Sequence, residues 1–243
     1  LVKYMREKYG DTFCISVSGY PEGHPNVITL VPAAEVASLT PAERGRMIEM
    51  KNAETNEMET WCCRDADFAK EIAYLKEKVD AGADMIITQM FFDAPVFLAF
   101  VDACKAAGIN VPIIPGIMCI QAYGGFKRMT AFCKSRVPAD LMAAVEAAGD
   151  GDAEAIRKVG IAHGAKMCKE LLAGGVSGLH FYSLNLEKVT NGILKELGRF
   201  KETVDDASAT KPADDDAAIA KGTFLDAALD KKKDTEDSAK QDS

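Results

Sequence analysis

Apolar residues along the chain follow two rhythms that alternate with each other. Four short apolar runs, at residues 12–19, 85–91, 111–118 and 178–184, have the length of strands that are buried on both faces. Between the runs, apolar positions recur every three or four residues, which is the spacing of amphipathic helices. This alternation is typical of βα units and predicts an α/β fold with a parallel sheet.

The stretches between the runs carry the start and stop signals of helices. Gly108 and Gly10 each follow a helical pattern, and glycine tolerates the left-handed turn that ends many helices. Asp150 or Asp152 is placed to cap a later helix. Crossovers of this length are expected to be right-handed and to cover the sheet. Besides the N-terminal helix, the predicted helices are at residues 67–81, 94–107, 138–148, 153–173 and 187–197.

One connection, residues 26–66, is much longer than an ordinary loop between a strand and a helix. Within it, Thr40, Pro41 and Glu43 have the order of a helix N-terminal capping box, which predicts a helix running to about Asn52. The segment is either a surface insertion or a functional lid. Trp61, the single tryptophan, is expected to anchor it to the body of the domain.

The composition changes again after residue 200. Residues 201–243 contain 12 acidic and 7 basic residues, which predicts a disordered acidic tail. A closed (β/α)8 barrel of the TIM type needs about eight strands and roughly 250 residues, so residues 1–200 predict either a small open sheet or half of such a barrel. Because the chain starts directly in a helical pattern, we expect the C-terminal half, with about the last four βα units.

Charge, hydropathy and cysteine content exclude several classes of function. A net charge of −8 argues against a nucleic-acid partner held through phosphate contacts. No window approaches the roughly 18 consecutive apolar residues of a membrane span. The seven cysteines are scattered without Cys-x-x-Cys spacing, so we expect neither a metal site nor a disulfide framework. A reducing, cytoplasmic compartment suits them.

Polar side chains stand at the ends of two predicted strands. Gln89 lies near the end of an apolar run, where it needs either an internal hydrogen-bond partner or a ligand. Tyr20, Glu22 and His24 lie together in the turn that follows the first strand. Because the active sites of parallel barrels lie at the carboxyl ends of the strands, this edge of the sheet is the candidate site.

Charged residues on the helix at 67–81 leave two interpretations open. Glu71, Tyr74 and Lys78 share one face through their spacing of three and four residues. They form either a solvated, ion-paired surface or a group in which Lys78 reaches a phosphate or a ribose.

General motifs do not assign the reaction. The sequence contains no phosphate-binding loop, nucleophile elbow or zinc-protease motif. The βα alternation leaves several interpretations open: a folate-binding or aldolase-like barrel enzyme, or a non-catalytic barrel remnant acting as a scaffold. None of the four predicted strands ends in the lysine that a Schiff-base aldolase needs.

Five segments, in order, resemble the methylenetetrahydrofolate reductases. The resemblance covers roughly residues 1–200 apart from the insertion, and the stretch at 123–134 is most similar to the eukaryotic, plant-type branch. It implies a (β/α)8 barrel in which NADH or NADPH reduces FAD, and the flavin then reduces 5,10-methylenetetrahydrofolate to 5-methyltetrahydrofolate. The segments are Gly-Tyr-Pro-Glu-Gly-His-Pro (19–25), Leu-Lys-Glu-Lys-Val-Asp-Ala-Gly-Ala-Asp (75–84), Ile-Thr-Gln-Met-Phe-Phe-Asp (87–93), Pro-Ile-Ile-Pro-Gly-Ile-Met (112–118) and Gly-Leu-His-Phe-Tyr-Ser-Leu-Asn (178–185).

The resemblance implies roles on the cofactor side of the site. Tyr20 and His24 match positions that contact FAD, and Lys78 matches a basic residue near its ribose or phosphates. Glu71 stands where the family often has Asp. The family's general acid Glu and its Arg-Gly-Asp flavin loop belong to the first half of the barrel. We therefore expect no catalytic residue in this chain and no activity from it alone.

The resemblance also implies substrate contacts. Gln89 matches the amide that holds the folate pterin, and Tyr182 matches a tyrosine of the substrate site. Met129 stands where some bacterial members have a Phe, so it implies an apolar contact without aromatic stacking. Leu186 stands where many members have an Arg that binds the glutamate tail of folate. A homo-oligomer is the expected assembly.

Overall fold

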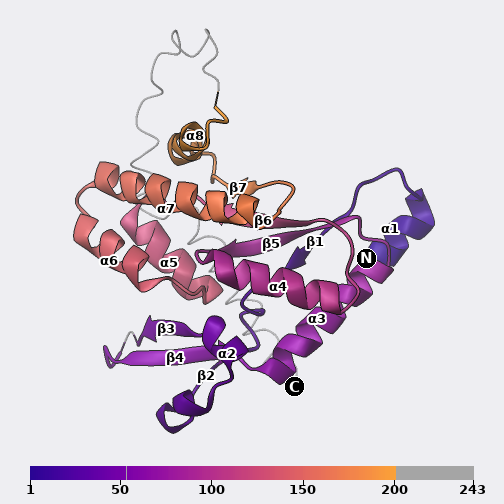
Figure 1. The fold of residues 1–243 in the computed structure, drawn as a ribbon, viewed down its shortest axis with the longest axis horizontal. Coiled ribbons are helices and arrows are strands. Elements are labelled where there is room, and N and C mark those ends of the chain that lie inside the picture. Colours follow the sequence, from indigo (N-terminus) through magenta and orange to yellow (C-terminus); the bar gives the residue numbers. More distant parts are fainter. Residues whose placement is uncertain (53, 201–243) are drawn as a thin grey trace, which may run out of the picture.

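Four parallel strands in the order β1-β5-β6-β7 form the main sheet of the computed structural model, which describes residues 1–52 and 54–200 (Figure 1). They are β1 (Ser16–Gly19), β5 (Met85–Phe91), β6 (Ile113–Met118) and β7 (His180–Tyr182), each inside its predicted range. Their order along the sheet is their order along the chain, as in successive βα units. The prediction of a parallel α/β sheet of the partial-barrel type is confirmed. The predicted tail at 201–243 lies outside the described residues.

Helices follow the strands as predicted, with one exception. Three helices rather than two separate β6 from β7, because residues 123–133 form an additional one. Gly124 and Gly125 in its first turn weaken the local helix signal, and the helix is stabilised instead by burying Phe126 and Cys133. Asp152 caps α7 by accepting hydrogen bonds from the next turn. The helices are α1 (Val2–Tyr9), α3 (Asp65–Asp80), α4 (Ala94–Ala106), α5 (Tyr123–Cys133), α6 (Ala139–Ala148), α7 (Ala153–Ala173) and α8 (Glu187–Glu196).

Apolar side chains of β5 and β6 pack against α3, α4, α7 and α8. Phe91 of β5 and Ile117 of β6 pack with Phe97 of α4 and residues of α7 and α8 in one fully buried cluster. A second cluster joins Ile86 of β5 to Phe100 of α4 and to α3. The strands and the helices that follow them are therefore held in layers, with the carboxyl ends of the strands directed to one edge.

The insertion is a small antiparallel sheet and not mainly a helix. Its strands are β2 (Ile28–Leu30), β4 (Met58–Cys63) and β3 (Ile48–Lys51), in the order β2-β4-β3, with a 3-10 helix at Ala33–Ser38. The capping box is confirmed, since Thr40 and Glu43 exchange hydrogen bonds of 3.0 and 3.1 Å. The predicted helix to Asn52 is wrong: α2 (Pro41–Gly45) ends early, because the apolar and polar residues of 48–51 alternate and pair with β4.

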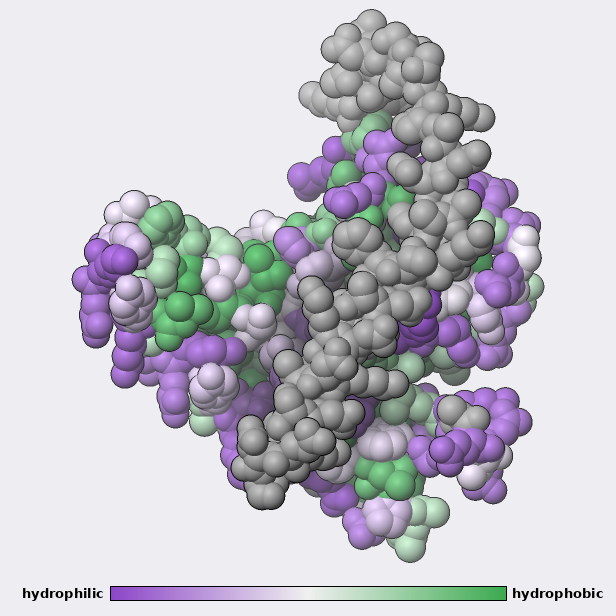
Figure 2. Space-filling model, turned by 180° about the vertical axis from the view of Figure 1, so that it is seen from behind, coloured by the Kyte–Doolittle hydropathy of each residue, from purple (hydrophilic) through white to green (hydrophobic). Residues whose placement is uncertain are grey.

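Trp61 contacts the main body through one cation, as predicted. The ammonium of Lys134, just after α5, lies 4.4 Å from the centroid of the Trp61 ring and donates a hydrogen bond of 2.7 Å to the carbonyl of Ile28. Apolar residues remain exposed on the surface of the insertion at residues 26–66 (Figure 2). Leu30 is 50% exposed and Met58 is 64% exposed.

A buried carboxylic acid joins the turn after β1 to the rest of the molecule. Glu22 accepts a hydrogen bond of 2.9 Å from the backbone N–H of Arg136. The Arg136 guanidinium pairs with Asp93 at 3.0 Å and donates to the carbonyl of Met47 in the insertion. Burial raises the pKa of Glu22 to about 8 against the opposing effect of Arg136. Glu22 is therefore mainly protonated at neutral pH.

A β-bulge in β5 lies at the centre of the sheet edge. Ile87 pairs with Ile114 and Met90 pairs with Gly116, so Thr88 and Gln89 together face a single residue of β6. That residue is Pro115, which has no N–H to contribute to the ladder. A Cβ at position 116 would approach the Thr88 carbonyl and the Tyr182 ring closer than 3.0 Å. Only glycine therefore allows β5, β6 and Tyr182 to meet here.

Gly116→Ala should lower the free energy of unfolding by about 1–3 kcal/mol, because the added methyl group overlaps backbone as well as a packed ring. Urea denaturation of the complete protein measures the loss. Gly124→Ala is the matched control, since nothing lies within 4 Å of its Cβ; it should be neutral or stabilising by up to about 1 kcal/mol. Equal denaturation midpoints for the two variants would contradict this assignment.

Glu22→Gln should remove a pH dependence of stability. The pKa of Glu22 is raised from 4.5 to about 8 in the folded protein. Between these values the folded protein holds a proton that the unfolded chain releases, so the free energy of unfolding falls as pH rises, by up to about 1.4 kcal/mol per pH unit. Urea denaturation of the wild type and of Glu22→Gln at about pH 5 and about pH 8 measures this change in the free energy of unfolding. The same pH dependence in both proteins would rule out this role for Glu22.

Candidate active site

The carboxyl ends of β5, β6 and β7 converge on one phenol. Tyr182, the last residue of β7, donates a hydrogen bond of 2.9 Å to the Thr88 carbonyl on β5, passing over Gly116 of β6. Burial raises the pKa of Tyr182, and Tyr20 and Cys133 act in the same direction. The phenol is therefore neutral at physiological pH and remains a hydrogen-bond donor.

Gln89 lies in the bulge beside this contact and is half-buried. Its Oε1 accepts a hydrogen bond of 3.0 Å from the backbone N–H of Met90. Within the described part of the chain, the NH2 group of Gln89 has no hydrogen-bond partner. The two explanations left open by the sequence therefore apply to different ends of the amide: the oxygen has an internal partner, and the nitrogen presents two donors to a ligand.

An open cavity of about 1050 Å³ brings together the four residues predicted to bind the cofactor. Tyr20 and His24 come from the turn after β1, and Glu71 and Lys78 come from α3. The rings of Tyr20 and His24 meet edge to face, with centroids 4.7 Å apart. The cavity therefore combines two aromatic rings, a carboxylate and an ammonium group in one wall.

Lys78 extends along α3 to the end of β1. Its Nζ donates a hydrogen bond of 2.7 Å to the carbonyl of Ser18 and lies 5.2 Å from the centroid of the Tyr74 ring. Burial lowers the pKa of Lys78, and the charge of Glu71 partly opposes this shift. The interpretation of this face as an ion-paired surface is wrong for Lys78, because its ammonium bonds to the sheet edge at the cavity.

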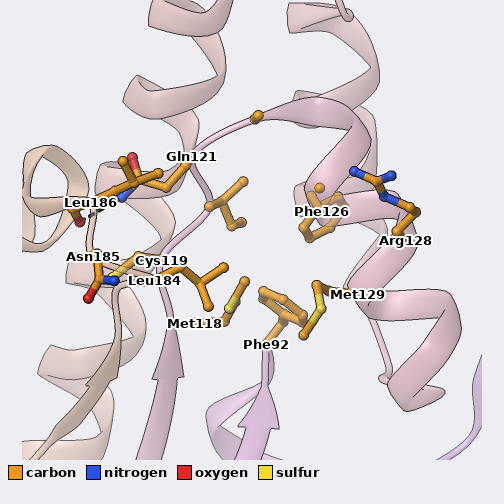
Figure 3. Close-up of a pocket in the computed structure, with 13 residues that line it drawn as sticks. Phe92, Met118, Cys119, Gln121, Phe126, Arg128, Met129, Leu184, Asn185 and Leu186 are labelled. Atoms are coloured by element: carbon orange, nitrogen blue, oxygen red, sulfur yellow. Dashed lines mark hydrogen bonds between the residues drawn. The ribbon is translucent and has the colours of Figure 1, made fainter. Parts of the chain in front are cut away.

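A second cavity, of about 340 Å³, lies between the ends of β6 and β7 and the first turns of α5 (Figure 3). Met129, which the sequence placed at the substrate, is part of its wall. Figure 3 shows Met129, Phe92 and Met118 close together, with Leu184 beside them. Most of the cavity wall is apolar, which suits an aromatic ligand.

Several residues of this second cavity were missed by the sequence analysis. Gln121 could have been found from the sequence, because it is a polar residue that closely follows an apolar strand. Its amide nitrogen donates a hydrogen bond of 3.1 Å to the carbonyl of Leu186. Leu184 and Asn185 both have positive φ, 52° and 63°, a conformation that is strained for leucine. Arg128 was missed because the additional helix α5 was not predicted, and Phe92, directly after β5, was not distinguished from the other apolar residues of that run.

Tyr182 lies between the two cavities, although among the described residues neither it nor Gln89 lines either one. It packs with Met129 and Met118 in the apolar cluster behind the second cavity. On the other side, Tyr20 of the first cavity is close enough to raise the pKa of Tyr182. Tyr182 therefore lies near Tyr20 of the first cavity and Met129 of the second.

Residues 1–52 and 54–200 contain no group of three or more His, Cys, Asp or Glu side chains that could hold a metal ion. No helix in this part of the chain is long and apolar enough to span a membrane.

Comparison with known proteins gives a consistent result. The chain is 44% identical over 203 residues to methylenetetrahydrofolate reductase (NADH) 1 of Arabidopsis thaliana, a match that covers 84% of the chain and 29% of the relative. It is 37% identical over 204 residues to methylenetetrahydrofolate reductase 1 of Schizosaccharomyces pombe, covering 84% and 27%. With 5,10-methylenetetrahydrofolate reductase of Escherichia coli, it is 34% identical over 186 residues, covering 76% and 50%.

The chain thus spans less than a third of the plant and yeast relatives and half of the bacterial one. The sequence model of the methylenetetrahydrofolate reductase family matches residues 1–198, which include all four strands of the parallel sheet and the helices around them. This chain belongs to the methylenetetrahydrofolate reductase family.

Proposed function

We propose that this chain supplies the flavin and folate sites of an enzyme that reduces 5,10-methylenetetrahydrofolate to 5-methyltetrahydrofolate with NADH or NADPH. One observation carries the proposal. The two free donors of the Gln89 amide lie in the β5 bulge, beside the Tyr182 hydrogen bond to Thr88, at a sheet edge that borders a large open cavity and a smaller, mainly apolar one. Two neighbouring cavities at the carboxyl ends of the same parallel strands suit a reaction between two ring systems.

The larger cavity fits FAD in its chemistry. Tyr20 and His24 offer ring faces and edges to an aromatic group, and Lys78 offers a cation to a phosphate or to a ribose hydroxyl. Glu71 helps to keep Lys78 protonated. FAD, when bound, supplies hydride transfer from the nicotinamide to the folate. The chain's own residues bind and orient the reactants.

The folate site combines Gln89 and Tyr182 with Met129. A pterin edge alternates donors and acceptors, and an amide can match it without the cost of burying a charge. Tyr182 holds the Thr88 carbonyl and thereby the bulge from which Gln89 projects. Met129 and its apolar neighbours exclude water from the rest of the ligand. No residue of this chain is assigned as the general acid.

The compartment and the metabolic role of the enzyme are inferred from its thiols and from the proposed product. All seven cysteines are free thiols, which suits a reducing compartment such as the cytoplasm. The product of the proposed reaction carries a methyl group, so the enzyme would act in one-carbon metabolism and supply methyl groups for methionine biosynthesis. We propose a homo-oligomeric assembly.

Gln89→Ala in the complete enzyme should keep the flavin and lose folate turnover. Loss of a polar contact to the pterin should reduce kcat/KM for 5,10-methylenetetrahydrofolate by about 10- to 100-fold. Oxidation of the nicotinamide by a quinone acceptor does not need folate and should be unchanged. Flavin absorbance near roughly 450 nm reports the bound cofactor. A colourless protein, or normal folate turnover, would refute the role of Gln89.

Lys78→Met should weaken FAD binding, because a charge-assisted hydrogen bond to the cofactor is lost; we expect the dissociation constant to rise about 10-fold. Release of FAD on dilution, followed by its fluorescence, measures the change. Lys76→Met is the matched control on the same helix, since Lys76 pairs with Asp80 at 2.6 Å on the surface. Equal FAD release from the two variants would show that Lys78 does not contact the cofactor.

A further inference from the structure

The insertion at residues 26–66 begins in the wall of the larger cavity. Its first two residues, Asn26 and Val27, line that cavity beside His24 of the preceding turn. The backbone N–H of Asn26 donates a hydrogen bond of 3.2 Å to Nδ1 of His24, and the N–H of Val27 donates one of 2.9 Å to the carbonyl of His24. A neutral His24 ring therefore carries its proton on Nε2, which has no hydrogen-bond partner in the described part of the chain and can donate to a ligand.

The turn also packs directly on the small sheet of the insertion. Gly23 is buried and has a φ of 97°, and a Cβ added to it would lie 2.6 Å from the Cβ of Cys63, so a side chain does not fit there. Cys63 is the last residue of β4 and pairs with Ile28 of β2. The ammonium of Lys134, after α5, donates to the carbonyl of the same Ile28. The turn is therefore supported by β2 and β4.

Arg136 connects this turn to the insertion and to the end of β5. Its backbone N–H donates to the buried Glu22, its Nε donates to Asp93 at 3.0 Å, and one terminal nitrogen donates to the carbonyl of Met47 at 2.9 Å. Asp93 lies two residues after β5, and Met47 directly precedes β3. The three partners are 43 to 114 residues away from Arg136 along the chain, so one residue closes three long-range contacts.

We propose that Arg136 is a positioning residue, which holds the turn with Tyr20 and His24 in the geometry that binds the cofactor. This assignment rests on the proposed function, in which that turn contacts FAD. Arg136 does not line the larger cavity, so it acts through the turn and not on the cofactor itself. The insertion is the second support of the turn, which makes it a part of the cofactor site and neither a plain surface insertion nor a lid.

The test measures the dissociation constant of FAD in the complete enzyme, by titration of the FAD-free protein followed by flavin fluorescence. Arg136→Met breaks the contacts to Asp93 and Met47 and should raise this Kd about 10-fold, because the turn is no longer held in one geometry. Arg136→Lys can still pair with Asp93 and should have an intermediate Kd. Arg44→Met is the matched control: the Arg44 guanidinium donates to two carbonyls within the insertion, and its loss should leave Kd unchanged.

A second measurement separates positioning from a general loss of structure. If Arg136 acts through the turn, Arg136→Met should raise Kd by about twofold at most when Tyr20→Ala and His24→Ala have already removed both rings. A purely structural role would raise Kd by the same factor with and without the rings.

The outcomes separate the two proposals. If the wild type binds FAD and Arg136→Met has the wild-type Kd, the Arg136 assignment fails and the proposed function stands. The assignment also fails if Arg44→Met raises Kd as much as Arg136→Met, or if the rise is the same with and without the two rings. If the wild type binds no FAD, the proposed function fails, and the Arg136 assignment fails with it.

Discussion

The close approach of three strands at Gly116 is the constraint on which the rest of the site depends. β5 bulges opposite Pro115, which contributes no N–H, and the missing side chain at position 116 lets Tyr182 reach the Thr88 carbonyl. This contact ties β7 to β5 across β6. Gln89 lies in the same bulge, and its side-chain oxygen accepts a hydrogen bond from the backbone of its own strand.

Charge is distributed around this edge so that the centre is neutral and the cations lie at its borders. Burial keeps Tyr182 and Glu22 protonated, and neither places a negative charge at the sheet edge. Lys78 borders the large cavity and Arg128 borders the small one.

Local signals in the sequence were enough for the regular part of the fold. Met85–Phe91 and Ala153–Ala173 have the predicted bounds because a pure apolar run and an Asp-capped periodic helix are unambiguous. The missed elements lack such signals. The two glycines of α5 hide a helix whose stability comes from burying Phe126, and residues 48–51 became a strand because β4 offers a partner. The α5 helix depends on packing against distant segments, and the short β3 strand depends on pairing with β4; propensity contains neither.

The sequence by itself determined the βα alternation, the polar residues at the strand ends and, through five ordered segments, the resemblance to a reductase family. The tertiary structure alone decided which of these residues share a cavity. It placed Tyr20, His24, Glu71 and Lys78 around one space and Met129 with Arg128 around another. The reason is physical: a strand end is a local property of the chain, whereas a cavity exists only where packed elements leave space between them.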